Sequence, residues 1–320
     1  MSKRQFVLVS LVYALLLLGC WKDNEVFNPY EVPQVYELKE FFAELKAEAL
    51  KKRPGHTGQN FYWITEKGSV IQIPANSLVL ADGTSCDCAM TLEYLEAYNK
   101  SEILAFGVPT IAKGGHLIES GGEFFIQAKT TDGKSLKLKS GKTIKLQVQV
   151  QAGGQIDPDM LLFTLGSDST WVPDTTTQVN GGEWNLRDSL QGWGFGYECF
   201  PKSLEWINID KFVDVPEDQR TPVCVDLPEK YNAKNTAVFM VFKDLNSVVG
   251  LSWNEKEGHF CEPYGKVPLG YEVTFVVISR QGEEEYHLAT ADAKITKDHH
   301  QDMVPQKATL EDIKEIIKNL

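Results

Sequence analysis

The feature that most constrains the fold is a strict alternation of apolar and polar side chains. It is clearest in TIKLQVQVQ, residues 143–151, where Ile144, Leu146, Val148 and Val150 alternate with lysine and glutamine. Successive side chains of a β-strand point to opposite faces of the sheet, so this run has one apolar and one solvated face. Such a pattern is typical of an antiparallel sheet that is covered on one side, as in a β-sandwich.

Further strand-length runs lie on both sides of this one. They include GGEFFIQAKTTDGKSLKL, GWGFGYE, TAVFMVFKDLNSVVGLSW and YEVTFVVISRQG. Asp132-Gly133 and Gln281-Gly282 lie between apolar runs and predict hairpin turns. The chain is therefore expected to be mainly β, with two β-sandwich-like domains. Glycine and proline interrupt the strand pattern near residue 154, so we place the domains at 56–154 and 155–308.

A helix is expected near each end of the chain. Apolar residues recur at helical spacing within 33–55, and Pro54-Gly55 is expected to stop that helix. At the other end, 309–320 begins with Thr309 and Asp312 in the spacing of a capping box. The apolar stripe of this C-terminal helix consists of Leu310, Ile313, Ile316, Ile317 and Leu320.

The N-terminus has the parts of a secretory signal. Lys3 and Arg4 precede an apolar run, residues 6–18, which is too short for a membrane span of about 20 residues. Leu17-Leu18-Gly19-Cys20 closes the run and resembles the bacterial lipobox, in which the cysteine becomes the first mature residue. We therefore expect 1–19 to be a lipoprotein signal peptide, 20–32 a lipidated tether, and Cys20 the lipid carrier.

The residues after Cys20 bear on the side of the membrane. In WKDNE, Lys22 is followed by the acids Asp23 and Glu25. This resembles the short export signal of surface-displayed lipoproteins in Bacteroidota. The resemblance implies a lipid-anchored protein of the outer membrane that faces the cell exterior. The alternative is the periplasmic face of the same membrane, since solvated tethers are often charged.

The charge of the chain opposes two classes of partner. The net charge is −12, and loss of Lys3 and Arg4 with the signal takes it to about −14. Nucleic acids are bound largely through lysine and arginine, so no nucleic-acid partner is expected. Repulsion likewise opposes adhesion to anionic lipid, and the plain consequence of the charge is solubility.

Residues 59–151 carry a resemblance to a known module. GSVIQIPANSL (68–78), ESGGEF (119–124) and LKSGKTI (138–144) resemble a β-sandwich module of uncharacterised envelope lipoproteins of Bacteroidota. IPANSL is also similar to ZU5-type interaction domains. Some of those domains cut themselves at a His-Phe-Ser step, which this sequence lacks, so the resemblance implies an interaction module without autoproteolysis. EWINIDKF, NTAVFMVFKDLNSVVGL and VPLGYEVTFVVISRQG resemble the C-terminal part of the same lipoproteins.

Five cysteines remain beside Cys20. They are Cys86, Cys88, Cys199, Cys224 and Cys261. An exported chain permits disulfides, but an odd number cannot pair completely within one molecule. A pair among the last three is expected. The Cys86-Asp87-Cys88 step is expected to be a loop thiol or a disulfide rather than a metal site, because no second ligand pair stands at zinc spacing nearby.

The catalytic motifs that we consider are incomplete or absent in this sequence. Gly141-Lys142-Thr143 ends like a phosphate-binding loop, but Leu136 stands where the earlier glycine is required. The HExxH and GxSxG patterns are absent from the sequence. Asp298 and His300 would share a face of a strand and could hold a metal, but a charged strand end explains them equally well. We therefore expect no metal and no cofactor.

Three tryptophans are candidate ligand contacts. Trp171, Trp184 and Trp193 stand in or beside a turn-rich stretch, and exposed aromatic side chains stack on sugars or fill protein pockets. The competing interpretation is that they close the ends of a sandwich.

The same stretch contains three candidate O-glycan acceptors. Ser169, Thr175 and Ser189 each follow an aspartate, and they resemble the Asp-Ser/Thr-apolar acceptor site of Bacteroidota. The competing interpretation is ordinary loop composition.

Taken together, the sequence predicts a non-enzymatic, lipid-anchored interaction or accessory protein of the outer membrane. Its partner would be another envelope protein or an outer-membrane complex. The alternative is a glycan-binding surface lipoprotein that uses the loop tryptophans. A hydrolase with a dispersed site is a third hypothesis, since the carboxylates of such a site meet only in the fold.

Overall fold

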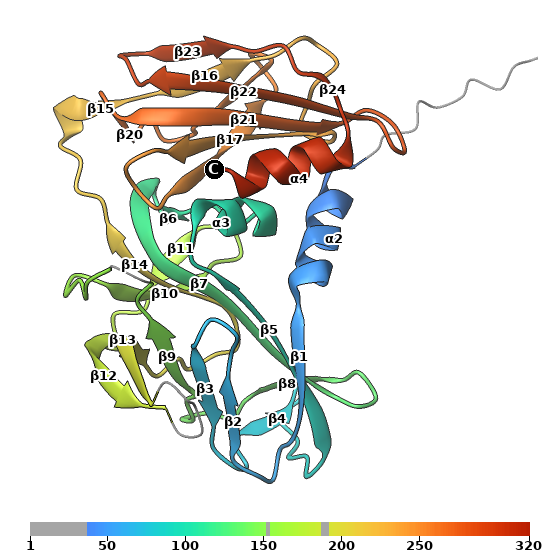
Figure 1. Ribbon diagram of the computed structural model, residues 1–320, viewed down its shortest axis with the longest axis vertical. Coiled ribbons are helices and arrows are strands. Elements are labelled where there is room, and N and C mark those ends of the chain that lie inside the picture. The colour runs from blue at the N-terminus through green and yellow to red at the C-terminus, as the bar shows by residue number, and fades with distance from the viewer. Residues whose placement is uncertain (1–36, 152–153, 187–191) are drawn as a thin grey trace, which may run out of the picture. The chain divides into compact units, whose positions relative to one another are not determined.

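Strands take up 48% of the described residues and helices 11%, so the expected mainly-β class is confirmed. The computed structural model describes residues 37–151, 154–186 and 192–320 (Figure 1). A helix near each end is confirmed as well. The chain from Tyr36 to Leu320 forms one compact unit. It contains a nine-stranded, an eight-stranded and a five-stranded sheet, together with a two-stranded ribbon.

The largest sheet has nine strands. They are β1 (Lys51–His56), β4 (Leu78–Leu80), β5 (Ala89–Ala97), β6 (Ile111–Ala112), β7 (His116–Thr130), β8 (Ser135–Leu138), β10 (Leu161–Leu165), β11 (Trp171–Pro173) and β14 (Glu205–Phe212). Their order is β1-β5-β7-β14-β10-β11-β6, and β8 joins β4 to β7. Because β6 also pairs with β7, five of the strands close into a barrel-like ring.

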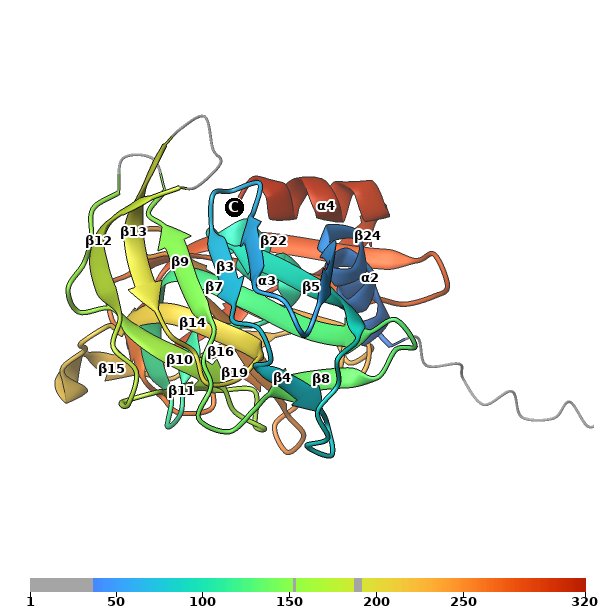
Figure 2. The same cartoon turned by 90° about the horizontal axis from the view of Figure 1, so that it is seen from below.

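A five-stranded sheet covers one face of the nine-stranded sheet. It contains β2 (Phe61–Ile64), β3 (Val70–Ile73), β9 (Lys145–Gln149), β12 (Asn180–Asn185) and β13 (Trp193–Cys199), in the order β12-β13-β9-β3-β2. Figure 2 shows it lying across β7 and β14. Leu146 and Val148 of β9 point into the core between the two sheets, as their alternation predicts, whereas the amide of Gln147 donates to Glu198 on the other face.

Strand β7 bends at a bulge and so contributes to two cores. The pairing register with β14 shifts between Ile209 and Asp210, which leaves Gly121 as the extra residue. A Cβ on Gly121 would lie 2.9 Å from the Ile209 carbonyl oxygen, so a glycine is required there. Beyond the bulge, Phe124 packs into the core of the two sheets, whereas Leu117 packs into the core of the eight-stranded sheet.

An eight-stranded sheet forms the other half of the unit. Its strands are β16 (Val223–Asp226), β17 (Thr236–Phe242), β18 (Val248–Asn254), β19 (His259–Cys261), β21 (Glu272–Arg280), β22 (Tyr286–Lys294), β23 (His299–Asp302) and β24 (Gln306–Ala308). The order is β23-β16-β19-β18-β17-β21-β22-β24. A short 3₁₀ turn η1 (Glu217–Gln219) leads into a two-stranded ribbon of β15 (Arg220–Thr221) and β20 (Val267–Pro268).

The centre of this sheet is buried on both faces. Met240 and Phe242 of β17 pack into one cluster, and Phe239 and Val241 pack into the cluster on the opposite face. A strand covered on both sides reads as a continuous apolar run rather than as an alternation. That is why TAVFMVF contains no solvated row.

The helices supply the cover on the second of these faces. They are α2 (Lys39–Ala49), α3 (Lys100–Phe106) and α4 (Leu310–Lys318). The rings of Phe41 and Phe42 contact Tyr286 and Phe239 of the sheet. Helix α4 buries Ile313 and Ile317, and it begins with the predicted capping box of Thr309 and Asp312. Figure 1 shows the three helices beside the eight-stranded sheet.

The N-terminal helix is shorter than expected. It ends at Ala49, and Leu50 already has extended backbone angles. Pro54 and Gly55, expected to follow the helix as its stop, lie inside β1 and pair with β5. β1 is an edge strand, where a proline without an N–H is tolerated. The pairing with β5, which local periodicity does not encode, decides this boundary.

The expected boundary between residues 154 and 155 runs through one sheet. Strands β10 and β14 follow it in the sequence, yet β14 pairs with β7, which precedes it. Leu162 and Ile207 therefore share a core with Leu146. The last strand of this sheet along the chain is β14, and the eight-stranded sheet begins at β16.

Candidate functional site

Two of the three candidate tryptophans are structural. Trp171 is 0% exposed, and its indole Nε1 donates to the carbonyl oxygen of Pro109 at 3.0 Å. Trp184 is 9% exposed and lies over Gly194, in a small cluster with Val70 and Leu186. Their expected role as ligand contacts is therefore corrected: packing covers both rings, as the competing interpretation held.

The third tryptophan is open to solvent. Trp193 is 64% exposed, and Phe195, two residues along β13, is 43% exposed. Alternate residues of a strand share a face, so the two rings form one apolar surface, which we call the Trp193–Phe195 face. Tyr197 and Cys199 continue the same row into the core. The neighbouring strand β12 is at the edge of the described sheet.

The candidate O-glycan acceptors lie in turns. Ser169 and Thr175 are exposed. In both turns, the preceding aspartate accepts hydrogen bonds from the backbone N–H and the hydroxyl of the residue two positions later. These bonds leave the candidate acceptor at the tip of each turn. Ser189 lies outside the described residues, and glycosylation of all three stays a prediction.

A cavity of about 460 Å³ opens where β1, β2, β5 and α3 meet, which is within the usual size of a small-molecule site. Glu96 lies in its wall. One oxygen of this carboxylate accepts hydrogen bonds from the hydroxyls of Thr65, Ser69 and Tyr94 at 3.1, 2.8 and 3.1 Å. Burial raises the pKa of Glu96, and the donated hydrogen bonds oppose that rise.

The charged groups around this cavity are largely paired with one another. Lys51 pairs with Glu66 at 3.1 Å, and Lys67 pairs with Glu102. The guanidinium of Arg53 lies 6.0 Å from the centre of the Trp63 ring and covers its face. No local sequence pattern predicts this cavity, because its wall comes from separate segments between residues 49 and 106. Its polar groups satisfy each other, so we assign it no ligand.

A second polar cluster lies at the bulge of β7. The side-chain amide of Asn208 donates to both Glu123 and Asp210. Both carboxyl groups are fully buried, and burial raises the pKa of each well above its usual value. A substrate cannot reach them without unfolding of the sheet.

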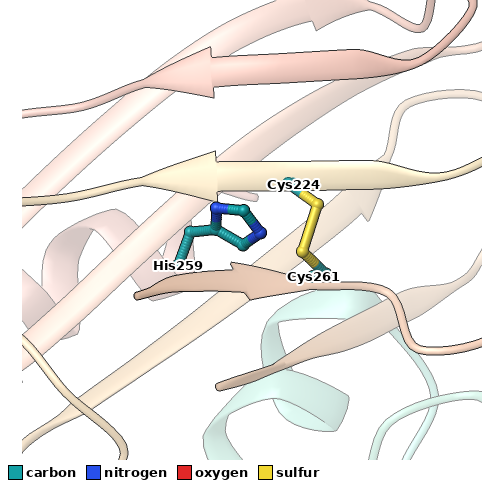
Figure 3. A group of neighbouring side chains, drawn as sticks. All are labelled: Cys224, His259 and Cys261. Carbon is teal, nitrogen blue, oxygen red and sulfur yellow. A yellow bond between two sulfur atoms is a disulfide. The ribbon is translucent and has the colours of Figure 1, made fainter. Parts of the chain in front are cut away.

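The cysteines pair in part. Cys224 and Cys261 form a disulfide between β16 and β19, which confirms a pair among the last three (Figure 3). Cys86 and Cys88 form a second disulfide. Cys199 is buried and unpaired, and burial raises the pKa of its thiol. Four of the five cysteines in the described part of the chain thus form two disulfides, and Cys199 has no disulfide partner there.

Next to the Cys224–Cys261 disulfide, three ligand-type side chains converge. His259 Nδ1 lies 3.2 Å from one oxygen of Asp226, and His300 Nδ1 lies 3.0 Å from the other. Figure 3 shows the His259 ring beside the disulfide. We call Asp226, His259 and His300 the histidine cluster. The residues come from β16, β19 and β23, which are neighbours in the sheet.

Sequence reasoning found only one member of this cluster. The sequence predicts that Asp298 and His300 share a face of one strand. In the structure, Asp298 lies before β23 at a positive φ of 50°, and its N–H donates to the Thr221 hydroxyl. The parallel pairing of β16 with β23 instead brings His300 to Asp226. No local pattern signals a contact between residues 74 positions apart.

The expected anchor lies outside the described residues. Cys20 and the export signal of Lys22, Asp23 and Glu25 all fall before residue 37. Among the described helices, none is both long enough and apolar enough to cross a membrane. Searches with protein-family models and among curated proteins find no match to this chain.

Proposed function

We propose that this chain is a lipid-anchored protein of the bacterial outer membrane that binds another envelope protein and has no enzymatic activity. The anchor is the lipid on Cys20, which follows the basic and apolar parts of a signal peptide. Lys22 and Asp23 support display at the cell surface through their resemblance to the export signal of Bacteroidota lipoproteins.

The Trp193–Phe195 face carries the proposal of a protein partner. Trp193 is 64% exposed beside the half-exposed Phe195, whereas most large apolar side chains of the described residues are buried. Apolar neighbours exposed together mark interaction surfaces, and tryptophan is enriched among the residues that dominate binding energy. The face lies on β13, next to the outermost described strand β12 of its sheet, so a partner can approach it from near the sheet edge.

The role without catalysis is supported by the positions of the acids. The carboxyl groups whose pKa values are raised most, those of Glu123 and Asp210, are sealed in the core. Glu96 lines a cavity, but one oxygen of its carboxylate is held by three hydroxyl groups. Perturbed groups at an active site would need to be reachable by substrate.

Glycan binding is the second candidate function. It rests on Trp193 alone, since Trp171 and Trp184 are packed inside the fold. A single exposed ring offers one stacking surface for a sugar. A glycan site normally adds polar groups that fix the sugar hydroxyls, so this candidate is the weaker one.

Cross-linking on intact outer membranes tests the partner. The wild type is compared with Trp193→Ala/Phe195→Ala and with Phe200→Ala, a control in which an exposed aromatic ring just after the end of β13 is removed. We expect one stoichiometric protein partner for wild type and control, and at least a tenfold loss for the double variant. Equal capture by all three chains contradicts the proposed face, and retention on polysaccharide without a protein partner favours glycan binding.

The anchor and the side of the membrane have separate tests. Cys20→Ala should abolish labelling by radioactive fatty acid and release the protein from membranes. Protease added to intact cells should degrade the wild type, and Lys22→Ala/Asp23→Ala should protect it. A wild type that resists protease on intact cells but not after lysis places the protein on the periplasmic face and contradicts surface display.

A further inference from the structure

We propose that the histidine cluster, Asp226, His259 and His300, binds a divalent transition-metal ion such as Zn²⁺. One ring nitrogen of each histidine and one carboxylate oxygen lie within 4.8 Å of one another. Two imidazoles and a carboxylate form a donor set suited to Zn²⁺, Cu²⁺ or Ni²⁺ rather than to Mg²⁺ or Ca²⁺. This site is independent of the proposed partner face, which lies on β13 of another sheet.

The distances fit a bound ion. A tetrahedral zinc ion, at about 2.0–2.2 Å from each ligand, separates its ligand atoms by about 3.3–3.6 Å. His259 Nδ1 lies 3.2 Å from one oxygen of Asp226 and His300 Nδ1 lies 3.0 Å from the other, both a little less than this separation. Small movements of the His300 side chain, which is 56% exposed, are enough to admit the ion.

The surroundings of His259 provide a second, independent observation. Its Nε2 lies 2.9 Å from Glu257, whose carboxylate also accepts from the amide of Asn254. Metal-binding histidines regularly donate their other ring N–H to a carboxylate, which fixes the tautomer and orients the ring. With the proton on Nε2, the lone pair of Nδ1 points at an Asp226 oxygen, which is itself an acceptor. A cation between these two atoms turns that repulsion into coordination.

The three protein ligands leave a coordination position of the ion open to a group from outside the chain. Three protein ligands leave at least one position of a tetrahedral ion for water or for a group on a partner. The cluster is reached from solvent, because Asp226 and His300 are both partly exposed. With the disulfide closed, Cys224 and Cys261 are not thiolates, so the ligands of this site are the two imidazoles and the carboxylate.

Calorimetric titration of the purified full-length protein with Zn²⁺, without reductant, tests the proposal. We expect one ion per chain for the wild type. His259→Ala, His300→Ala and Asp226→Asn should each weaken Zn²⁺ binding by more than about 100-fold, and Glu257→Gln by about 10-fold. His56→Ala is the matched control, because His56 pairs with Asp87 but is not part of the histidine cluster, and it should bind Zn²⁺ like the wild type.

A second measurement distinguishes loss of Zn²⁺ binding from loss of folding in the variants. Zn²⁺ should raise the melting temperature of the wild type and of His56→Ala but not of His300→Ala, whose exposed side chain can be lost without disturbing the core. Wild-type protein without one-to-one binding overturns the proposal, as does equal binding by His300→Ala and Asp226→Asn. Binding that appears only after reduction of the disulfide also overturns it, because the ligands would then be the thiolates of Cys224 and Cys261 beside His259.

Discussion

Glu123 and Asp210 share one hydrogen-bond donor, the side-chain amide of Asn208, at the bulge where β7 crosses between two cores. Among the described residues, the second oxygen of the Glu123 carboxyl group has no hydrogen-bond partner. Burial raises the pKa of both groups well above their usual values. The folded protein therefore keeps these acids protonated in a range of pH where the unfolded chain would ionise them.

This relationship predicts how stability depends on pH. The unfolded carboxyl group of Glu123 ionises near pH 4.3, whereas its pKa in the folded state is raised, so stability falls as pH rises between the two values. Glu123→Gln removes that loss and should stabilise the protein at pH 8 by about 1–3 kcal/mol relative to wild type. Urea unfolding at pH 5 and pH 8 measures the effect.

The control for this prediction is Glu44→Gln, on the exposed side of α2. Its effect on the free energy of unfolding should be small and the same at both pH values. Parallel pH dependence of the wild type and Glu123→Gln would show that the buried acid is not the source of the effect.

The two disulfides should differ in their contribution to stability. Cys224 and Cys261 are 37 residues apart, whereas Cys86 and Cys88 are separated by only 2. A longer closed loop restricts the unfolded chain more, so Cys224→Ser/Cys261→Ser should lose about 3–4 kcal/mol and Cys86→Ser/Cys88→Ser about 1–2 kcal/mol. Guanidinium unfolding without reductant compares them. Equal losses would contradict the chain-entropy account for this protein.

Removal of the Trp171 ring should destabilise the fold strongly, whereas removal of the Trp193 ring should leave its stability nearly unchanged. Trp171→Ala opens a cavity and removes the hydrogen bond that the indole donates to the Pro109 carbonyl, so we expect a loss of about 3–5 kcal/mol. Trp193→Ala should change the free energy of unfolding by less than about 0.5 kcal/mol. Acrylamide should quench the fluorescence of Trp193 strongly, and quenching should fall in Trp193→Ala. A large destabilisation by Trp193→Ala would mean that its ring packs in the fold.

The C-terminal helix depends on its cap. Thr309 accepts a hydrogen bond from the N–H of Asp312, whose carboxylate bonds back to the N–H and hydroxyl of Thr309. Thr309→Ala should cost about 1 kcal/mol, and Thr309→Ser should retain most of the stability. Hydrogen exchange of the α4 amides measures the difference locally. Exchange rates that are the same in Thr309→Ala and wild type would show that packing of Ile313 and Ile317 alone holds the helix.

Local patterns in the sequence were enough to identify several elements. The alternation of residues 143–151 identified a strand and the face that it buries, because the side-chain period of a strand is two. Thr309 and Asp312 identified the start of α4, because a cap is made within one turn. The five cysteines beside Cys20 cannot all pair with one another, and Cys199 has no disulfide partner among the described residues.

Only the tertiary structure decided which segments meet. Trp171 and Trp193 stand in similar turn-rich sequence, yet one is buried against Pro109 and the other is exposed on β13. The pairing of β14 with β7 carried one sheet across the expected domain boundary, and the pairing of β16 with β23 assembled the histidine cluster. Periodicity reports which face a residue occupies. Pairing between distant strands depends on the packing of the whole chain, so the sequence alone determined the elements and the fold determined the sites.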